Sequence, residues 1–199
     1  MYMPFYAVHT GHIQGGVYST WDECKREAHK KPKYKKFATR EEAALFAERG
    51  PTVDENFDVV VYTDGACSKN GKEGAKGGYG VFFGATDPRN ASGRIVGKAT
   101  NNIAELTAII KAIEILKDTT GSVGIYTDSK YAILCCTTYG AKCEKKDWVD
   151  VPNAALVKQA YELVKSRNVQ LVYVPAHTGN TDPHSLGNQQ ADLLATSCW

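Results

Sequence analysis

The sequence predicts an α/β protein, with a mixed five-stranded sheet flanked by helices and a small α+β module in front of it. Its 199 residues suffice for one full α/β core and a small satellite module. The strand patterns of the core begin as a meander and then alternate with helical patterns, which indicates a mixed sheet covered by helices. Residues 59–64 form an apolar run that ends in Thr-Asp, which is typical of a strand buried on both faces.

The N-terminal module is expected to begin with two short strands around a Gly-containing turn, at residues 5–20. A helix at 20–31, a strand at 33–37 and a second helix at 39–50 are expected to follow. Thr39 and Glu42 have the spacing of a capping box at the start of the second helix. Gly50–Pro51 ends that helix. Residues 1–50 are therefore assigned to one domain and residues 51–57 to a short polar linker.

The larger domain is assigned to residues 58–199. Its expected elements are strands at 59–64, 72–85 and 94–99, a helix at 101–118, a strand at 121–128, helices at 129–140 and 152–168, a strand at 169–177 and a helix at 187–197. The helix at 101–118 has the clearest pattern, because apolar residues recur at helical spacing, at Leu106, Ile109, Ile113 and Leu116.

Composition excludes several classes of protein. No apolar run approaches the length that spans a bilayer. None of the six cysteines forms a CxxC pair, which argues against a structural zinc site and favours free thiols in a soluble, intracellular protein. The formal net charge is only +2, but it is unevenly distributed. Residues 1–50 hold nine basic and six acidic residues, whereas the remainder holds fifteen basic and sixteen acidic residues. The basic N-terminal part fits an anion-binding accessory beside a metal-binding core.

Two strands end in the same tripeptide, Tyr-Thr-Asp, at Tyr62–Asp64 and Tyr126–Asp128. If the strands are parallel neighbours, both carboxylates emerge at one edge of the sheet, where open α/β sheets place their ligands. Asp also follows strands as a turn former or helix N-cap, and that interpretation stays open at this point.

Two helical carboxylates extend the pattern. Glu105 is expected in the first turn of the 101–118 helix, on the face that carries Ile109 and Leu116. Its alternative role is a favourable interaction with the helix dipole. Asp192 stands among apolar residues of the last helix in the same way. Four clustered carboxylates would repel one another unless cations bind between them, and oxygen-only ligands suit Mg²⁺ or Mn²⁺. Two such ions about 4 Å apart can promote phosphodiester hydrolysis.

At this point the sequence resembles the type 1 class of the ribonuclease H family. The motifs occur in the family's order across residues 58–199, as YTDGACSKNG, ATNNIAELTAI, IYTDSKY, VPAHTGN and GNQQADLLA. The resemblance implies a ribonuclease H-like fold and a Mg²⁺-dependent endonuclease that cuts the RNA strand of RNA–DNA hybrids. It also implies a metal-binding quartet, Asp64, Glu105, Asp128 and Asp192, with His177 assisting proton handling or product release.

The same resemblance implies substrate contacts. Asn70, Asn101 and Asn102 match residues that reach the minor groove, where 2′-hydroxyls identify RNA. Cys67 lies in the matching RNA-facing loop. Thr100 and Asn153 match a pocket for a phosphate of the DNA strand, and Asn188 matches the polar residue ahead of the last catalytic Asp. Capping or turn roles remain open for these residues. The basic segment at 139–150 is shorter than in many relatives, which leaves its role as a DNA-binding channel in doubt.

Residues 4–50 resemble the hybrid-binding domain at the N-terminus of eukaryotic members, through the strings FYAV, TWDEC and YKKFAT. The resemblance implies sugar stacking and phosphate contacts to the DNA strand by Trp21, Tyr34, Lys35 and Lys36, with Tyr6 near the RNA strand. Aromatic residues interleaved with lysines suit this role physically. Phe37 is expected instead in the module's small core.

Two other interpretations compete with a stand-alone nuclease. One is a non-catalytic hybrid-binding protein, and the presence of all four carboxylates and His177 argues against it. The other is the ribonuclease H part of a reverse-transcribing element, against which the hybrid-binding resemblance argues. The expected partner is an RNA–DNA hybrid, and neither a membrane nor a protein partner is inferred.

Overall fold

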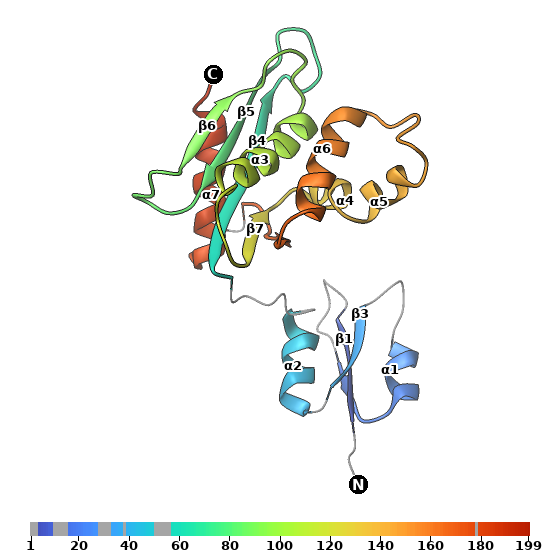
Figure 1. The fold of residues 1–199 in the computed structure, drawn as a ribbon. Coiled ribbons are helices and arrows are strands. Elements are labelled where there is room, and N and C mark those ends of the chain that lie inside the picture. Colours follow the sequence, from blue (N-terminus) through green and yellow to red (C-terminus); the bar gives the residue numbers. More distant parts are fainter. Residues whose placement is uncertain (1–3, 10–15, 28–32, 38, 50–56, 178) are drawn as a thin grey trace. The chain divides into compact units, whose positions relative to one another are not determined.

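The computed structural model describes residues 4–9, 16–27, 33–37, 39–49, 57–177 and 179–199. The chain divides into two compact units, residues 1–55 and 56–199 (Figure 1). No helix in the described parts of either unit is long and apolar enough to cross a membrane.

The N-terminal unit is a three-stranded antiparallel sheet with two helices. Its elements are β1 (Phe5–His9), β2 (Val17–Tyr18), α1 (Trp21–Glu27), β3 (Lys33–Phe37) and α2 (Arg40–Arg49), with strand order β2-β1-β3. Phe37 packs against the buried alanines of β1 and α2, which confirms its expected place in the small core. A capping box that the sequence analysis overlooked begins α1. The backbone N–H of Glu23 lies 3.3 Å from Oγ1 of Thr20, and the N–H of Thr20 lies 3.3 Å from Oε2 of Glu23. The box expected at Thr39 involves the Glu42 side chain, which lies outside the described residues.

The C-terminal unit confirms the mixed five-stranded sheet. Its strands are β4 (Val59–Ser68), β5 (Lys76–Phe82), β6 (Ala91–Arg94), β7 (Val123–Thr127) and β8 (Val169–Tyr173), in the order β6-β5-β4-β7-β8. The strands β4, β5 and β6 pair antiparallel, whereas β4, β7 and β8 pair parallel. The change from meander to alternating order in the sequence therefore marks the change of strand direction in the sheet.

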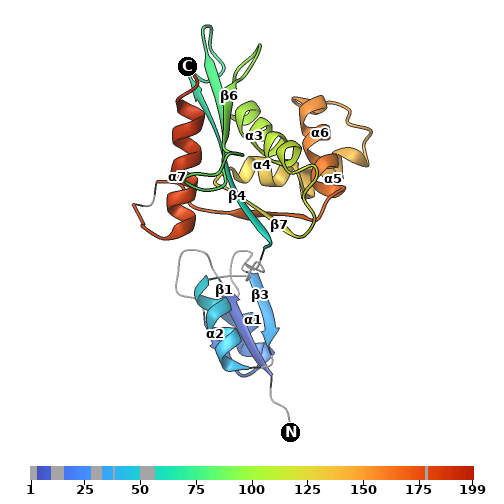
Figure 2. The ribbon, with the colours of Figure 1, turned by 60° about the vertical axis from the view of Figure 1, so that its left-hand side comes forward.

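Helices cover both faces of this sheet (Figure 2). One face carries α3 (Asn101–Ile115), α4 (Lys130–Cys135), α5 (Thr138–Glu144) and α6 (Ala154–Lys165), and the other carries α7 (Pro183–Thr196). The apolar stripe expected on α3 is buried, with Leu106, Ile109 and Ile113 fully enclosed between the sheet and α6. Burial of such side chains contributes about 1.5–3 kcal/mol each. The position of α3 is therefore set mainly by this core.

Several expected elements differ from the structure. The strand expected at 59–64 continues to Ser68, and the strand expected at 72–85 is shorter, at Lys76–Phe82. The strand expected at 94–99 is wrong, because β6 ends at Arg94 and Gly97 has a left-handed φ of 84°. The helix expected at 129–140 is two helices, with the break at Cys136–Thr137. The last helix begins at Pro183, because Asp182 caps it and a proline fits its first turn. The last strand ends at Tyr173, well before the expected residue 177.

Two glycines let helices approach the sheet closely. A side chain at Gly65 of β4 would overlap the backbone of α3 at Ala104 and Glu105. A side chain at Gly80 of β5 would overlap the carbonyl oxygen of Ala191 in α7. Gly65 follows Asp64 in the chain and Gly80 pairs with Asp64 across the ladder. Both helices are therefore closest to the sheet around the same carboxylate.

The substitution Gly65→Ala tests this packing. Its methyl group would collide with backbone rather than with a flexible side chain, so we expect a loss of at least the ~1–3 kcal/mol typical of overpacking, measured by urea unfolding. Gly84→Ala is the matched control, because a methyl group there meets no atom within 4 Å. Equal unfolding curves for the two variants would contradict the close-approach interpretation.

Candidate active site

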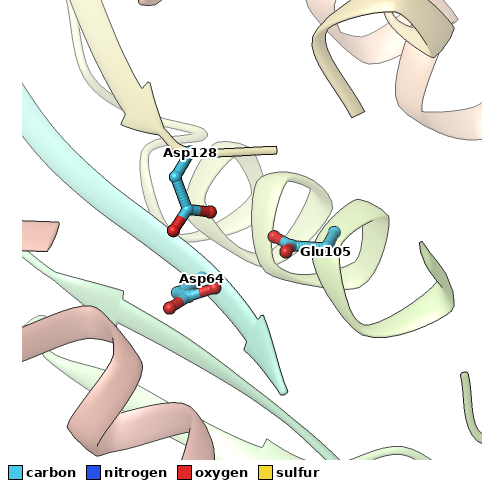
Figure 3. A group of neighbouring side chains, drawn as sticks. All are labelled: Asp64, Glu105 and Asp128. Carbon is cyan, nitrogen blue, oxygen red and sulfur yellow. The ribbon is translucent and has the colours of Figure 1, made fainter. Parts of the chain in front are cut away.

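Three of the expected carboxylates converge on one point. Asp64 of β4, Glu105 of α3 and Asp128 after β7 each offer an oxygen, and these oxygens lie within 4.8 Å of one another (Figure 3). The parallel register explains the two aspartates, because Tyr62 pairs with Tyr126 and each aspartate stands two residues further on. The repeated tripeptide thus places the two carboxylates side by side where β7 ends. The expectation that β4 also ends at Asp64 is wrong, because β4 continues to Ser68 in its antiparallel pairing with β5.

Glu105 lies in the second turn of α3, and the expectation of the first turn is wrong because the helix begins at Asn101. The side chain is only 5% exposed. Its Oε1 accepts a 3.5 Å contact from the amide of Asn101, whereas its buried Oε2 has no hydrogen-bond partner in the described part of the chain. A buried carboxylate oxygen without a partner is costly and is the kind of atom that a bound cation satisfies.

The environment opposes ionisation of these groups. Burial, followed by the charges of Asp128 and Asp192, raises the pKa of Asp64 to about 8. Burial, followed by the charges of Asp64 and Asp128, raises the pKa of Glu105 to about 10. The pKa of Asp128 is also raised, first by burial. The cluster can carry its full negative charge at neutral pH only with a compensating cation, and its all-oxygen donor set fits a hard divalent ion.

Asp192 lies beside the cluster of three rather than within it. It is half-buried on α7, and its charge raises the pKa of Asp64, Glu105 and Asp128. It lines a cavity of about 230 Å³ together with His177 and Asn188. The structure therefore brings three carboxylates into contact and the fourth to the rim of the same site.

His177 and Asn188 both interact with the carboxylate of Asp128. His177 is exposed in the loop after β8, has a left-handed φ of 47°, and lies near enough to lower the pKa of Asp128. The amide of the buried Asn188 donates to Oδ2 of Asp128 at 3.2 Å. Gly65 is a contributor that the sequence analysis did not single out. Its backbone N–H donates to Oδ1 of Asp64 at 2.7 Å, and its position directly after the tripeptide was the available signal.

The residues expected at the minor groove lie around the start of α3. Oδ1 of Asn70 accepts from the backbone N–H of Asn101 at 3.0 Å, which ties the loop after β4 to this helix. Cys67 is half-buried near the end of β4, and Asn102 is exposed in the first turn of α3. These four residues therefore belong to two adjoining segments.

The two residues expected at a phosphate pocket differ in their local roles. Oγ1 of Thr100 accepts from the backbone N–H of Ile103 at 3.2 Å, so the capping alternative for Thr100 is realised. Asn153 precedes α6 with a left-handed φ of 56° and makes no side-chain cap. Its side chain lies close to that of Tyr131.

The shortened basic segment at residues 139–150 lines a cavity. Tyr139, Lys142, Lys145 and Lys146 line a cavity of about 700 Å³ together with residues 149–151. Trp148 does not join them, because it packs against Tyr161 with ring centroids 5.9 Å apart. Lysines and one aromatic ring thus remain on a single surface.

In the N-terminal unit, the expected binding residues form an exposed aromatic row. The Trp21 ring lies between Tyr6 and Tyr34, with ring centroids 5.8 and 5.1 Å away. Trp21 is 39% exposed and Tyr34 is 54% exposed. Exposed Lys36 pairs with Tyr6 in the ladder and therefore shares its face. The side chain of Lys35 lies outside the described residues.

Comparisons with known proteins agree with this geometry. Residues 56–198 match the family described as RNase H, and residues 4–47 match the family described as Ribonuclease H1 N-terminal domain. The chain is 47% identical over 142 residues to Ribonuclease H of Schizosaccharomyces pombe, covering 68% of this chain and only about half, 51%, of that protein. It is 29% identical over 256 residues to Ribonuclease H1 of Homo sapiens, covering 96% of this chain and 87% of that protein.

Solved structures share the fold. The Prototype Foamy Virus Protease-Reverse Transcriptase matches 74% of this chain and 21% of its own chain, with a TM-score of 0.63 at 23% identity. LC9-RNase H1, whose structure is described as a type 1 RNase H with the type 2 active-site motif, matches 70% of each chain with a TM-score of 0.57 at 25% identity.

The raised pKa values predict how the metal-free protein responds to pH. The unfolded chain releases these protons near pH 4, whereas the folded protein retains those of Asp64 and Glu105 to about pH 8 and 10. Because the folded state binds more protons between these limits, the free energy of unfolding should fall as pH rises from 5 to 8 in EDTA. The slope approaches about 1.4 kcal/mol per pH unit for each retained proton.

Urea unfolding at several pH values measures this dependence. Glu105→Gln should make the slope shallower, since it removes one of the retained protons. Glu114→Gln is the control, because Glu114 is 43% exposed on the same helix and pairs with Lys111 at the surface. A slope in Glu105→Gln as steep as that of the wild type would rule out this origin.

Proposed function

Because this chain belongs to the ribonuclease H family, we propose that it is an endoribonuclease that hydrolyses the RNA strand of RNA–DNA hybrids. Two Mg²⁺ ions are the proposed cofactors, with Mn²⁺ as a substitute. The convergence of Asp64, Glu105 and Asp128 around a buried, unpartnered carboxylate oxygen is the observation that carries the proposal.

The proposed metal ligands are Asp64, Glu105, Asp128 and Asp192. When bound, divalent ions activate a water molecule and stabilise the leaving oxygen of the phosphodiester. The chain itself holds the ligands in orientation. The Gly65 N–H fixes one oxygen of Asp64, and the Asn188 amide fixes one oxygen of Asp128. Loss of such contacts to metal ligands typically lowers metal affinity by about 10- to 100-fold.

His177 is proposed to move a proton at the reacting phosphate or to help the product depart. His177 is exposed beside Asp128, and an imidazole ring can both donate and accept a proton. A loop position suits a group that must approach the substrate and then withdraw. Both features support a role in the cleavage step rather than in holding the fold.

RNA is proposed to be distinguished from DNA at the start of α3. Asn70, Asn101 and Asn102 offer amides, and Cys67 borders the same surface. Amides that donate and accept can bind a 2′-hydroxyl, which is itself both donor and acceptor. Thr100 and Asn153 are proposed to hold a phosphate of the DNA strand. The Thr100 hydroxyl can still donate to a phosphate, because its oxygen only accepts in the cap.

Residues 1–50 are proposed as a hybrid-binding domain joined by residues 51–57 to a catalytic domain at 58–199. The row formed by half-buried Tyr6 and exposed Trp21 and Tyr34 supports this assignment. Lys35 and Lys36 of β3 are the proposed phosphate-binding residues. Ring stacking and phosphate neutralisation together would bind the hybrid without reading its sequence.

Cleavage of three end-labelled duplexes tests the activity directly. With Mg²⁺ we expect cuts in the RNA strand of an RNA–DNA hybrid and none in duplex RNA or duplex DNA, and EDTA should abolish cutting. Binding of the hybrid without cleavage would instead support a non-catalytic hybrid-binding protein.

Asp128→Asn should give a folded, hybrid-binding and inactive protein. The substitution keeps the shape and an oxygen that can accept from Asn188, but it removes a charge and a strong ligand oxygen. Metal-free thermal stability should stay equal or rise, since repulsion in the cluster falls. Asp118→Asn carries the same charge change on an exposed residue and should cleave normally. Near wild-type cleavage by Asp128→Asn would refute the metal site.

The triple variant Trp21→Ala, Lys35→Ala, Lys36→Ala should weaken hybrid binding, most clearly at moderate salt. Each lost phosphate contact should reduce the slope of log affinity against log salt by about 1. Cleavage at saturating hybrid should survive. Lys36→Ala alone can be compared with Arg40→Ala, which removes an exposed cation at the start of α2. Unchanged affinity and salt dependence in the triple variant would refute the assigned face.

A further inference from the structure

A buried cluster of aromatic rings contains the residue two positions before Asp64 and the residue two positions before Asp128. Tyr62 and Tyr126, the first residues of the two Tyr-Thr-Asp tripeptides, are buried with ring centroids 5.5 Å apart. His184, in the first turn of α7, stacks on Tyr126 with centroids 4.2 Å apart and planes 7° from parallel. Its Nδ1 lies 3.1 Å from the hydroxyl oxygen of Tyr62. One imidazole therefore contacts both strands that carry the aspartates.

The N-terminal end of α7 is fitted closely to these rings. A side chain at Gly187 would overlap the ring of Tyr62, so the second turn of the helix rests directly on that tyrosine. The Asp182 carboxylate accepts from the backbone N–H groups of His184 and Ser185 at 3.1 Å each. The Asp182 cap determines the residue at which α7 begins. The contacts with the aromatic rings determine where this end of the helix lies on the sheet.

The helical spacing connects this contact to the active site. His184, Asn188 and Asp192 are four residues apart and therefore share one stripe of α7. Asn188 donates to Asp128, and Asp192 faces the carboxylate cluster. A helix moves nearly as a rigid rod, so a shift or rotation at His184 would displace both residues together.

We propose that His184 is a positioning residue, whose stack on Tyr126 and hydrogen bond with Tyr62 hold α7 in the register that presents Asn188 and Asp192 to the site. The Tyr62 hydroxyl donates to Nδ1 when the imidazole proton is on Nε2. The consequence for metal binding and cleavage rests on the proposed function, whereas the contact itself does not.

A double-mutant cycle in EDTA tests the contact independently of activity. His184→Phe keeps a flat ring on Tyr126 and removes Nδ1, and Tyr62→Phe removes the same hydrogen bond from the other side. We expect each single variant to unfold at lower urea and the double variant to be hardly less stable than either, because both lose one shared interaction. Additive losses would overturn the assigned hydrogen bond.

Calorimetric titration with Mn²⁺, without nucleic acid, tests the positioning role. His184→Ala should bind Mn²⁺ roughly tenfold more weakly than the wild type, as do changes to residues that orient metal ligands. His184→Phe should recover part of the affinity through the retained stack. In parallel, the Mg²⁺ concentration for half-maximal hybrid cleavage should rise and kcat should fall in His184→Ala, while KM for the hybrid stays unchanged.

Two control variants separate positioning from general destabilisation. Gln190→Ala changes an exposed residue of α7, and Val164→Ala lowers stability from α6, where the side chain packs on the core. Both should bind Mn²⁺ like the wild type at a temperature where all variants are folded. Mn²⁺ affinity in His184→Ala equal to that of Val164→Ala would overturn the proposal. A wild-type protein that fails to cleave hybrid would refute the proposed function, while the Mn²⁺ titration would still decide the role of His184.

Discussion

The C-terminal unit depends on how closely two helix backbones approach Asp64. Glycine at positions 65 and 80 lets α3 lie against one side of this carboxylate and α7 against the other. A carboxyl side chain is short, so Glu105 can reach Asp64 only from a helix whose backbone touches the strand. Backbone contact, rather than side-chain reach, therefore determines the geometry of the site.

This geometry is electrostatically unfavourable in the metal-free chain, and the hydrophobic core sustains it. Glu105 stands on the stripe of α3 that also carries Leu106, Ile109 and Ile113, which are fully buried. Their burial stabilises the helix by several kcal/mol, which exceeds what one displaced carboxylate could regain by moving into water. Burial raises the pKa values of all three carboxyls, and these side chains would hold a cation in place of their protons. The folded chain thus holds its ligands ready before a metal binds.

The sequence predicted this site well where local pattern and tertiary position coincide. The repeated tripeptide specified Asp64 and Asp128, because strand register follows from parallel pairing of two buried runs. The sequence did not predict the features that depend on tertiary packing. No local sequence pattern shows that Asp192 lies beside the cluster of three carboxylates. Its position depends on how closely Gly80 lets α7 approach the sheet. The strand expected at 94–99 is wrong because Val96, though apolar, is 96% exposed in the irregular segment that follows β6. The start of α7 was missed although Asp182–Pro183 carried a start signal.

The two units use aromatic residues in opposite ways, and this difference bears on their roles. In the C-terminal unit Tyr62 and Tyr126 are almost fully buried and support the helix that bears Asp192. In the N-terminal unit Trp21 and Tyr34 form a row that remains substantially exposed to solvent. A small unit that buries little apolar surface gains stability by burying its largest rings. Leaving these rings exposed forgoes that gain. Stacking on the bases and sugars of the proposed nucleic-acid ligand would recover it.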